Sequence, residues 1–300
     1  MNGAEGSRDG NLGAEPLVSI IIPVLNGERH IAACLASVLE QSYERLEVVV
    51  VDNASSDRTV EIVASFEDSR VRLVTNAGPQ LGLHENWTRA LKEGHGEFIK
   101  IVPHDDLLHV RCVATQIDLL RRYPTAVLAS SRRRIVDDRD SVIVPSRGLG
   151  RLVGREGTRL IKGPAVARAC VRAGTNLLGE PACVLIRHSA LPDPPFDPRW
   201  SYALDIEFYL RCLQGRFAAL DAQSLCDFRA SPNQLSAVLG ARQASEMRAF
   251  LRQMSRTYPD DVTRLDVVVG ATRSQFIVWA RRLLYLFMRV REAARARRNS

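Results

Sequence analysis

The chain has 300 residues, of which 46% are hydrophobic and 25% are charged, an ordinary mixture for a globular protein. This composition excludes collagen-like, disordered and disulfide-stapled classes for the chain as a whole. The net charge of +7 is concentrated at the C-terminus, where residues 281–300 hold seven Arg and one acid. A nucleic-acid-binding domain spreads basic residues over a face of its fold, so we expect no nucleic-acid partner.

The six Cys residues form no CxxC pair and do not cluster with His. This spacing argues against a zinc site or a disulfide framework, and we expect a reducing, cytoplasmic location. Residues 1–16 are rich in Gly and lack an apolar run, so they are interpreted as a disordered tail and not as a signal peptide or anchor. No stretch of eighteen apolar residues predicts a transmembrane helix.

Buried-strand patterns alternate with helical patterns up to about Arg122. The predicted strands are 17–22, 46–51, 71–75 and 97–102, and the predicted helices are 27–41, 56–66, 83–93 and a fourth that begins near Leu107. This alternation predicts βαβ units and a mostly parallel sheet. Ligands bind beyond the carboxyl ends of such strands, which selects Pro23–Asn26, Asp52–Asn53 and His104–Asp106. Gly-rich dinucleotide and P-loop motifs are missing from the sequence.

The second half of the sequence has a less regular pattern. It predicts short strands at 127–130, 142–144, 182–187 and 217–220, helices at 158–173 and 205–214, and a Pro-rich loop at 191–200. From about residue 234 the pattern is helical to the end. We therefore expect a tail over 1–16, an α/β domain over 17–233 and a helical extension over 234–300.

Three segments, in this order, resemble the family 2 glycosyltransferases, including those that build bacterial polysaccharides. They are SIIIPVLNGERHIAACLASVLEQSYERLEVVVVDNASSDRT, GHGEFIKIVPHDDLL and ALDIEFYLRCLQGRF, and the resemblance covers about residues 17–235. It implies a GT-A fold and inverting transfer of a sugar from a nucleotide diphosphate, with a UDP-sugar as the expected donor. A glycan or a lipid-linked sugar is the expected acceptor.

The resemblance also implies a nucleotide site. Asp52 matches the family's nucleotide-binding Asp, although a turn residue explains Asp52-Asn53 equally well from the pattern alone. Val24 and Leu25 are expected against the base. Asn26 and Glu28 are expected near the nucleotide, or as a helix cap and a first-turn acid. The remaining residues expected on the donor or acceptor side are Pro23, Gly82, Asn86 and Glu180.

Asp105 and Asp106 match the family's DXD-type pair, here in the form HDD. The resemblance implies that Asp106 binds Mg²⁺ or Mn²⁺, with Asp105 on the ribose or on a metal-bound water. The alternative is that both cap a helix beginning near Leu107, and His104 beside them is interpreted as structural. Ser231 stands where many family members have a His, which places metal affinity in doubt.

Asp205 matches the family's general base, which takes the acceptor proton. An Asp directly before a helix is also a common N-cap, so that alternative stays open. Glu207 is the second candidate base, and Arg211 is interpreted as solvated. Trp200 and Tyr202 border the Pro-rich loop and either stack on a sugar or pack in the core.

The last helix combines an aromatic-rich apolar portion with Arg residues. That profile is typical of a helix lying on an anionic membrane, and also of one that packs on the core or in an oligomer. Two other functions are considered: a non-catalytic module that binds a nucleotide or glycan at the membrane, and nucleotidyl transfer. A Gly-rich basic triphosphate loop is missing after the first strand, which argues against nucleotidyl transfer.

Overall fold

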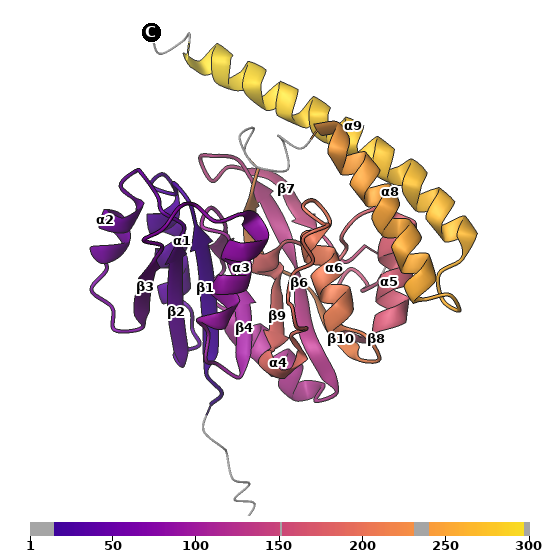
Figure 1. Cartoon of the computed structure of the whole chain (residues 1–300), viewed down its shortest axis with the longest axis horizontal. Helices are drawn as coiled ribbons and strands as arrows, with labels where there is room; N and C mark the ends of the chain where they lie inside the picture. The colour runs from indigo at the N-terminus through magenta and orange to yellow at the C-terminus, as the bar shows by residue number, and fades with distance from the viewer. Residues whose placement is uncertain (1–14, 151, 231–239, 297–300) are drawn as a thin grey trace, which may run out of the picture.

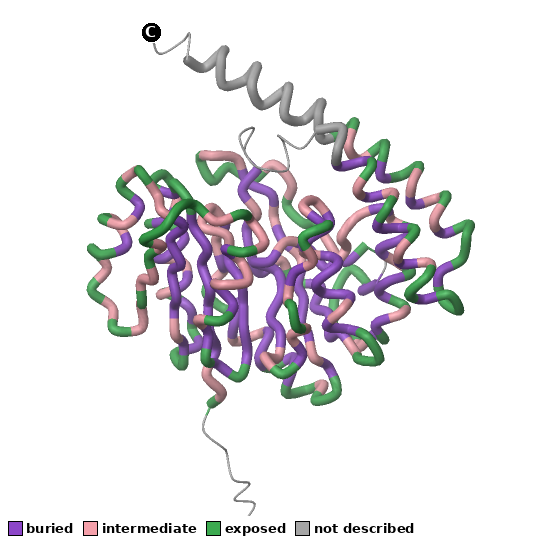
Figure 2. The backbone as a smooth tube through the Cα atoms, viewed as in Figure 1, coloured by how far each residue is buried: buried purple, intermediate pink, exposed green. Residues whose placement is uncertain are grey.

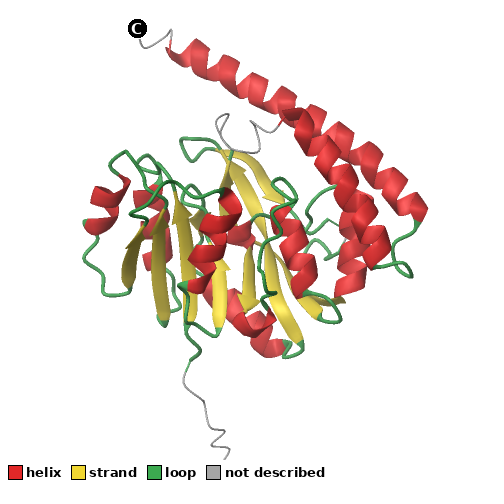
Figure 3. Cartoon of the chain, in the orientation of Figure 1, coloured by secondary structure: helices red, strands yellow, loops and turns green. Residues whose placement is uncertain are grey.

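The computed structural model describes residues 15–150, 152–230 and 240–296, with side chains described only over 243–280 in the last range. Within these residues the chain forms one ten-stranded sheet with helices on its two faces (Figures 1 and 3). The predicted α/β class is therefore confirmed. Among the described helices, none combines the length and apolar character that a bilayer span requires.

The first four long strands are parallel and lie in the order β3-β2-β1-β4. Their bounds are β1 (Val18–Val24), β2 (Leu46–Asp52), β3 (Val71–Thr75) and β4 (Phe98–Ile101). The connecting helices are α1 (Ile31–Leu39), α2 (Thr59–Ala64) and α3 (Leu83–Lys92). Every residue of β1 is buried because its apolar run is covered on both faces of the sheet. The strand order reverses between β1 and β4, which is the type of switch point where α/β sheets bind ligands.

The second half completes the sheet with strands of both directions. Its strands are β5 (Leu107–Leu108), β6 (Ala126–Val136), β7 (Val142–Arg147), β8 (Thr158–Lys162), β9 (Val184–Arg187) and β10 (Phe217–Arg229). Its helices are α4 (Cys112–Arg122), α5 (Gly163–Ala173), η1 (Pro181–Cys183), η2 (His188–Ala190) and α6 (Leu204–Cys212). Because β9 is antiparallel to both β4 and β6, and β10 is parallel to β6, the carboxyl ends of β1, β2, β4, β6 and β10 meet at one edge.

Two predictions for this half are wrong. Residues 158–162 form strand β8 and not the first turn of a helix, because Thr158–Lys162 pairs antiparallel with Phe217–Asp221 of β10. The predicted short strand at 217–220 continues to Arg229 because β6 lies beside it and supplies backbone partners along that length. Long-range pairing thus overrides the local pattern in both places.

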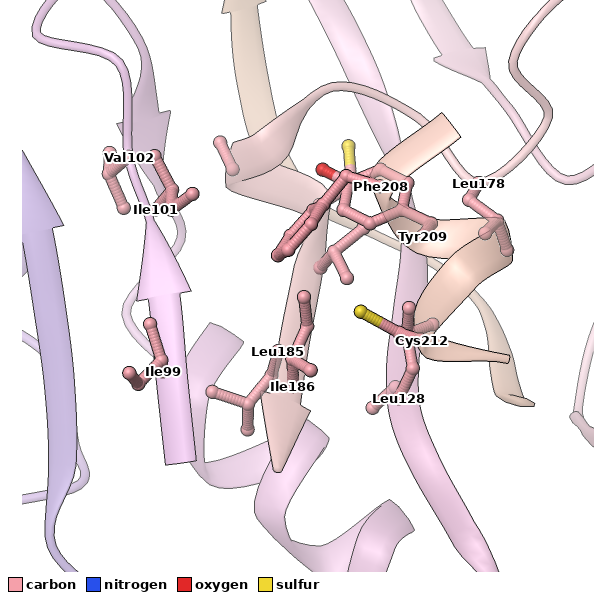
Figure 4. Close-up of a cluster of buried hydrophobic side chains, with 14 of the residues drawn as sticks. Ile99, Ile101, Val102, Leu128, Leu178, Leu185, Ile186, Phe208, Tyr209 and Cys212 are labelled. Carbon is pink, nitrogen blue, oxygen red and sulfur yellow. The ribbon is translucent and has the colours of Figure 1, made fainter. Parts of the chain in front are cut away.

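The core is continuous across the sheet and reaches α6 (Figure 2). Figure 4 shows Phe208 and Tyr209 of α6 above Leu185 of β9, and Cys212 of α6 above Leu128 of β6. All five are buried. One face of α6 is therefore fixed on the sheet. Its end leads into the first residue of β10, and because β10 runs toward the carboxyl edge, the start of α6 lies at that edge.

Two long helices follow, α8 (Gly240–Thr257) and α9 (Arg264–Ala296), and they lie beside α5 and α6 (Figure 1). The side chain of Asp266 on α9 accepts hydrogen bonds from Arg168 and Arg172 of α5, at 3.1 and 2.8 Å. Gly270 allows close contact between these helices, since a Cβ there would lie 1.8 Å from the carbonyl oxygen of Val171. The start of α9 is thus joined to the α/β body.

Candidate active site

The loops after β1 and β2 are tied together at the carboxyl edge by Asn26. Its Oδ1 accepts the N–H of Ser56 at 2.8 Å, and its own N–H donates to Ser55 Oγ at 2.8 Å. Asn26 has a positive φ of 51°, a conformation that Asn tolerates better than most residues. The residue that caps α1 is His30, so Asn26 does not serve as the helix cap.

The residues around Asn26 differ in what they can offer a ligand. Pro23 and Val24 are buried in β1, while Leu25 is 37% exposed and supplies the apolar surface at the end of that strand. The Glu28 carboxylate accepts the N–H of Arg58 at 3.1 Å, so it also joins the two loops.

Asp52 and Asn53 end β2 and are both buried. Both carboxylate oxygens of Asp52 accept the N–H of Ser55, at 3.3 and 3.2 Å, which is the turn role that the pattern allowed. The Asn53 side chain accepts the N–H of Leu81 at 2.8 Å and donates to its carbonyl at 2.9 Å. Asn53 therefore fixes the loop that leads into α3.

Gly82 and Asn86 lie at the start of that helix. Gly82 is the N-cap residue of α3, and its carbonyl accepts the N–H of Asn86 at 2.9 Å. Asn86 is buried, and its Oδ1 has no hydrogen-bond partner among the described residues.

Asp106 follows β4 and lies at the centre of the carboxyl edge. It is 1% exposed; Oδ1 accepts the N–H of Arg229 at 3.1 Å, and Oδ2 has no partner among the described residues. Burial, and secondly the neighbouring Asp105 carboxylate, raise the pKa of Asp106 well above its ordinary value. The helix expected to begin near Leu107 begins at Cys112, so the Asp pair does not cap it.

Arg229, at the end of β10, organises this acidic pair. Its Nε donates to the carbonyl of Asp105 at 2.9 Å, and its other nitrogens reach the carbonyl of Asp137 at 3.0 Å and the carboxylate of Asp140 at 2.6 Å. The loop after β6 is thereby held beside the loop after β4. Buried Arg229 was not among the predicted site residues, although it lies two residues before Ser231, which is outside the described residues.

A metal ion would fit this carboxylate pair. A buried oxygen without a partner in an acidic environment is what a hard cation would satisfy. The described residues contain no group of three or more His, Cys, Asp or Glu side chains placed to hold a metal. Further ligands would therefore come from outside these side chains, in keeping with Mg²⁺ sites that use one or two carboxylates plus substrate phosphates.

A buried ion pair lies between the acidic pair and α6. Arg133 of β6 donates from Nη2 to Glu180 Oε1 at 2.7 Å, and its Nε contacts Oε2. The charge of Glu180 raises the pKa of both Asp106 and Asp205. The Arg133–Glu180 ion pair is therefore close enough to interact electrostatically with both carboxyl groups. Glu180 was among the residues predicted from the sequence, whereas Arg133 was not, because Arg is common throughout this chain.

Asp205 is the second residue of α6, whose N-cap residue is Ala203, so Asp205 does not act as the cap. Its Oδ2 accepts the side-chain N–H of Asn176 at 2.9 Å, and its Oδ1 accepts the N–H of Ile206 at 2.7 Å. Burial raises the pKa of Asp205 to about 6, although the bond from Asn176 opposes this shift. A carboxyl group that titrates near neutrality suits general-base chemistry.

Glu207 and Trp200 are both occupied by contacts within the protein. The buried carboxylate of Glu207 pairs with Arg211 at 2.8 Å, and Arg211 also donates to the carbonyl of Pro194 at 2.7 Å. Arg211 is therefore engaged and not freely solvated. Trp200 is buried against Phe250 at 5.7 Å between ring centroids, in agreement with the core alternative.

Comparison with known proteins adds an independent finding. The family model described as "Glycosyl transferase family 2" matches residues 19–192. An uncharacterized protein of Mycobacterium tuberculosis is 34% identical over 211 residues, which are 67% of this chain and 63% of that protein. The Escherichia coli protein named UDP-Glc:alpha-D-GlcNAc-diphosphoundecaprenol beta-1,3-glucosyltransferase WfgD is 39% identical over 35% of this chain and 41% of its own length. The matched region is thus less than two thirds of either relative.

Solved structures share the fold at low sequence identity. Residues 1–349 of Staphylococcus aureus TarS in complex with UDP-GlcNAc give a TM-score of 0.62 at 17% identity, covering 82% of this chain and 72% of that one. The mannosyltransferase PcManGT of Pyrobaculum calidifontis, in complex with GDP-Man and Mn²⁺, gives 0.58 at 19% identity, covering 94% and 80%. These structures share the α/β architecture described above.

Proposed function

The chain belongs to glycosyl transferase family 2 and has the GT-A fold, and from this premise we propose that it is an inverting, metal-dependent glycosyltransferase. The observation that carries the proposal is the placement of two chemically distinct carboxyl groups at one sheet edge. Asp106 has a buried oxygen without a described partner, and Asp205 has a pKa near 6. The first fits a site for a metal and diphosphate, and the second fits a base for the acceptor.

The donor side would lie over the ends of β1 and β2. Exposed Leu25 offers an apolar surface for a base, and Asp52 is the carboxylate proposed to accept from it. Asn26, Glu28 and Asn53 hold the surrounding loops in place through the bonds described above. A UDP-sugar is the proposed donor, supported by the TarS complex with UDP-GlcNAc and by the name of WfgD.

The metal would be held by Asp106, with Asp105 on the ribose or on a metal-bound water. Mg²⁺ or Mn²⁺, when bound, would supply Lewis-acid neutralisation of the charge that develops on the departing diphosphate. Arg229 would keep both Asp residues in place, because it bonds the Asp106 carboxylate through its N–H and the Asp105 carbonyl through its side chain. PcManGT in complex with Mn²⁺ supports the choice of ion.

Asp205 would act on the acceptor. As the acceptor oxygen bonds to the anomeric carbon, the bond from that carbon to the diphosphate breaks and the hydroxyl proton passes to Asp205. Attack from the side opposite the leaving group inverts the anomeric centre. Asn176 would orient the base through its bond to Oδ2, and the Arg133–Glu180 pair would line the space between base and metal.

The proposed acceptor is a glycan or a lipid-linked sugar, supported by the diphosphoundecaprenol acceptor in the name of WfgD. We propose that α9 makes peripheral contact with the membrane that carries it. Four large apolar side chains of α9 are exposed: Leu265, Val268, Phe276 and Trp279. A cytoplasmic location is supported by the six cysteines, all buried and free of disulfides.

A donor panel tests the proposal. The purified chain is incubated with UDP-, GDP- and dTDP-sugars, with and without Mn²⁺, and thermal stability and nucleotide diphosphate release are measured. One donor should raise the melting temperature and be slowly hydrolysed in a metal-dependent way, since a ligand of the native state stabilises it.

Two variants give the panel its controls. Asp106→Asn should remove the metal dependence of donor binding, while Asp205→Asn should keep donor binding and lower transfer by roughly 10²-fold or more. Donor binding without any turnover, even with an acceptor library, would instead favour the non-catalytic module. Normal rates in both variants would contradict the assignment of the site.

A further inference from the structure

The loop that enters α6 is held by a side chain from the C-terminal helices. Glu246 of α8 directs Oε1 at three consecutive backbone N–H groups, those of Ser201, Tyr202 and Ala203, at 2.8, 2.6 and 2.9 Å. Hydrogen bonds from N–H groups to a carboxylate are stronger than those to a neutral acceptor. One oxygen of α8 therefore fixes the chain two to four residues before Asp205.

This contact anchors the segment directly before α6, where the local sequence supplies no side-chain cap. The N-cap residue of α6 is Ala203, which has no side-chain acceptor for the first N–H groups of the helix. Among the first N–H groups of α6, Asp205 Oδ1 accepts that of Ile206 and Glu246 accepts that of Ala203. The other two bonds of Glu246 hold Ser201 and Tyr202, which precede the helix. The start of α6 is thus stabilised from a helix more than forty residues away in sequence.

Two further contacts make α8 a support along α6. At the start of α6, Phe250 packs edge-on against Trp200 of the same loop, with 5.7 Å between ring centroids. At its end, the hydroxyl of Tyr258, just after α8, donates to the carbonyl of Leu210 at 3.1 Å. Met247, Phe250, Leu251 and Met254 of α8 are buried, so the support is anchored in the core.

We propose that Glu246, near the start of α8, is a positioning residue for the proposed base Asp205. The inference rests on the proposed role of Asp205. Glu246 acts through the backbone: it sets where α6 begins, and hence where the Asp205 carboxylate stands relative to the acceptor. Its Oε1 is engaged by three amides and takes no part in the proton transfer itself.

The test compares Glu246→Ala and Glu246→Gln with Tyr258→Phe. Tyr258→Phe is the control, because it removes one hydrogen bond between this support and the far end of α6.

Glu246→Ala should speed amide hydrogen exchange at residues 201–203. It should also lower kcat by about 10- to 100-fold and leave the donor KM within about twofold, because a small misplacement of a reacting group is costly. Glu246→Gln keeps a neutral acceptor, so its loss should be smaller. Tyr258→Phe should lower the melting temperature and leave kcat within about twofold.

A double variant separates positioning from general stability. If Glu246 acts through Asp205, then Glu246→Ala should change the residual rate of Asp205→Asn by less than about twofold, since residues that act as a unit are not additive. The proposal is overturned if kcat is unchanged in Glu246→Ala, if the loss persists in full in the Asp205→Asn background, or if amides 201–203 keep their protection.

The same set of measurements distinguishes failure of the proposed function. A wild-type chain that transfers no sugar would overturn the role of Asp205 and with it the positioning role. Hydrogen exchange at residues 201–203 does not depend on activity, so it would still report whether Glu246 fixes the loop.

Discussion

Asp205, the proposed base, is held by neutral hydrogen-bond donors and not by an ion pair. Its two described bonds come from the neutral donors of Asn176 and Ile206, and the nearby cation of Arg133 is already paired with Glu180. Burial dominates and raises the pKa of Asp205 to about 6 from 3.8. A raised pKa means that the group gains its charge only as the pH passes about 6.

The pH dependence of turnover follows from this value. Because a base must be unprotonated to accept a proton, kcat/KM should rise with pH through about 6 and level off above about 7. Initial rates from pH 5 to pH 8, with the metal saturating, measure this limb. Asn176→Ala removes a hydrogen bond that lowers the pKa of Asp205, so the rise of kcat/KM in this variant should move to higher pH. A limb that stays near pH 4 in the wild type would contradict the assignment.

The residues proposed to carry the chemistry were selected from the sequence, whereas the residues that hold them in place were not. Asp106 and Asp205 lie in segments whose local pattern resembles a family motif, so one stretch of sequence is enough to select each. Arg229 contacts Asp106 from 123 positions away in the sequence, and it lies at the end of β10, a strand that was predicted too short. Glu246 contacts Ala203 from 43 positions away, and it lies in a helix that carries no motif. Such contacts depend on the assembled sheet, which no local spacing reveals.

At the scale of elements, α9 is joined to α5 through one buried acid. Asp266 is fully buried, accepts from Arg168 and Arg172, and exchanges bonds with Thr263 at the start of α9 in the manner of a capping box. Burial alone would raise the pKa of Asp266, but these donors, the bond from Arg172 first among them, together lower it to about 2. The folded state therefore favours the ionised carboxylate more than the unfolded state does.

Replacing Asp266 should weaken the contact between α9 and α5 and so destabilise the folded chain. Asp266→Asn should lower the free energy of unfolding by ~1–3 kcal/mol at pH 7, since it weakens charge-assisted bonds in a buried position. With a lowered folded pKa, the stabilisation is full above about pH 4 and is lost as the pH falls through about 2. Denaturant unfolding at several pH values should show the difference from wild type shrinking in that window.

Asp260 provides a control for the contact that Asp266 makes between α9 and α5. Asp260 lies in the turn that leads into α9, six residues before Asp266, and is exposed, so Asp260→Asn should change the unfolding free energy by less than about 0.5 kcal/mol. Equal losses in the two variants would argue against a specific role for Asp266.

The elements themselves were predictable where local pattern and tertiary pairing agree. β3 was predicted with its observed bounds, and β1, β2 and α3 within about two residues at each end. Residues 158–162 failed because their conformation is set by β10, sixty residues later. Of the tail expected over 1–16, residues 1–14 lie outside the described residues, as does Ser231, so those expectations stay predictions.

At the scale of the whole molecule, α9 has two different faces. One buries Asp266, Gly270 and Ser274 against the body. The other exposes four apolar side chains, from 61% to 70% of their surface: Leu265, Val268, Phe276 and Trp279. Their spacing of three, eight and three residues places them on one side of the helix, and α9 continues to Ala296 through a segment rich in Arg.

That exposed stripe and the following positive charge should together bind an anionic bilayer. Apolar side chains enter the headgroup boundary while Arg residues attract anionic lipids, so binding should be strong to phosphatidylglycerol vesicles, weak to phosphatidylcholine vesicles and reduced by salt. Vesicle flotation with the full chain measures it. Phe276→Glu with Trp279→Glu should lower the bound fraction about tenfold, whereas Val110→Glu with Val142→Glu, at apolar side chains exposed elsewhere, should not. Equal binding to both lipids would contradict the charge argument. A chain dimer that the α9 variants dissociate would assign the stripe to a second copy instead, because one face of a helix covered by its partner is not available to lipid.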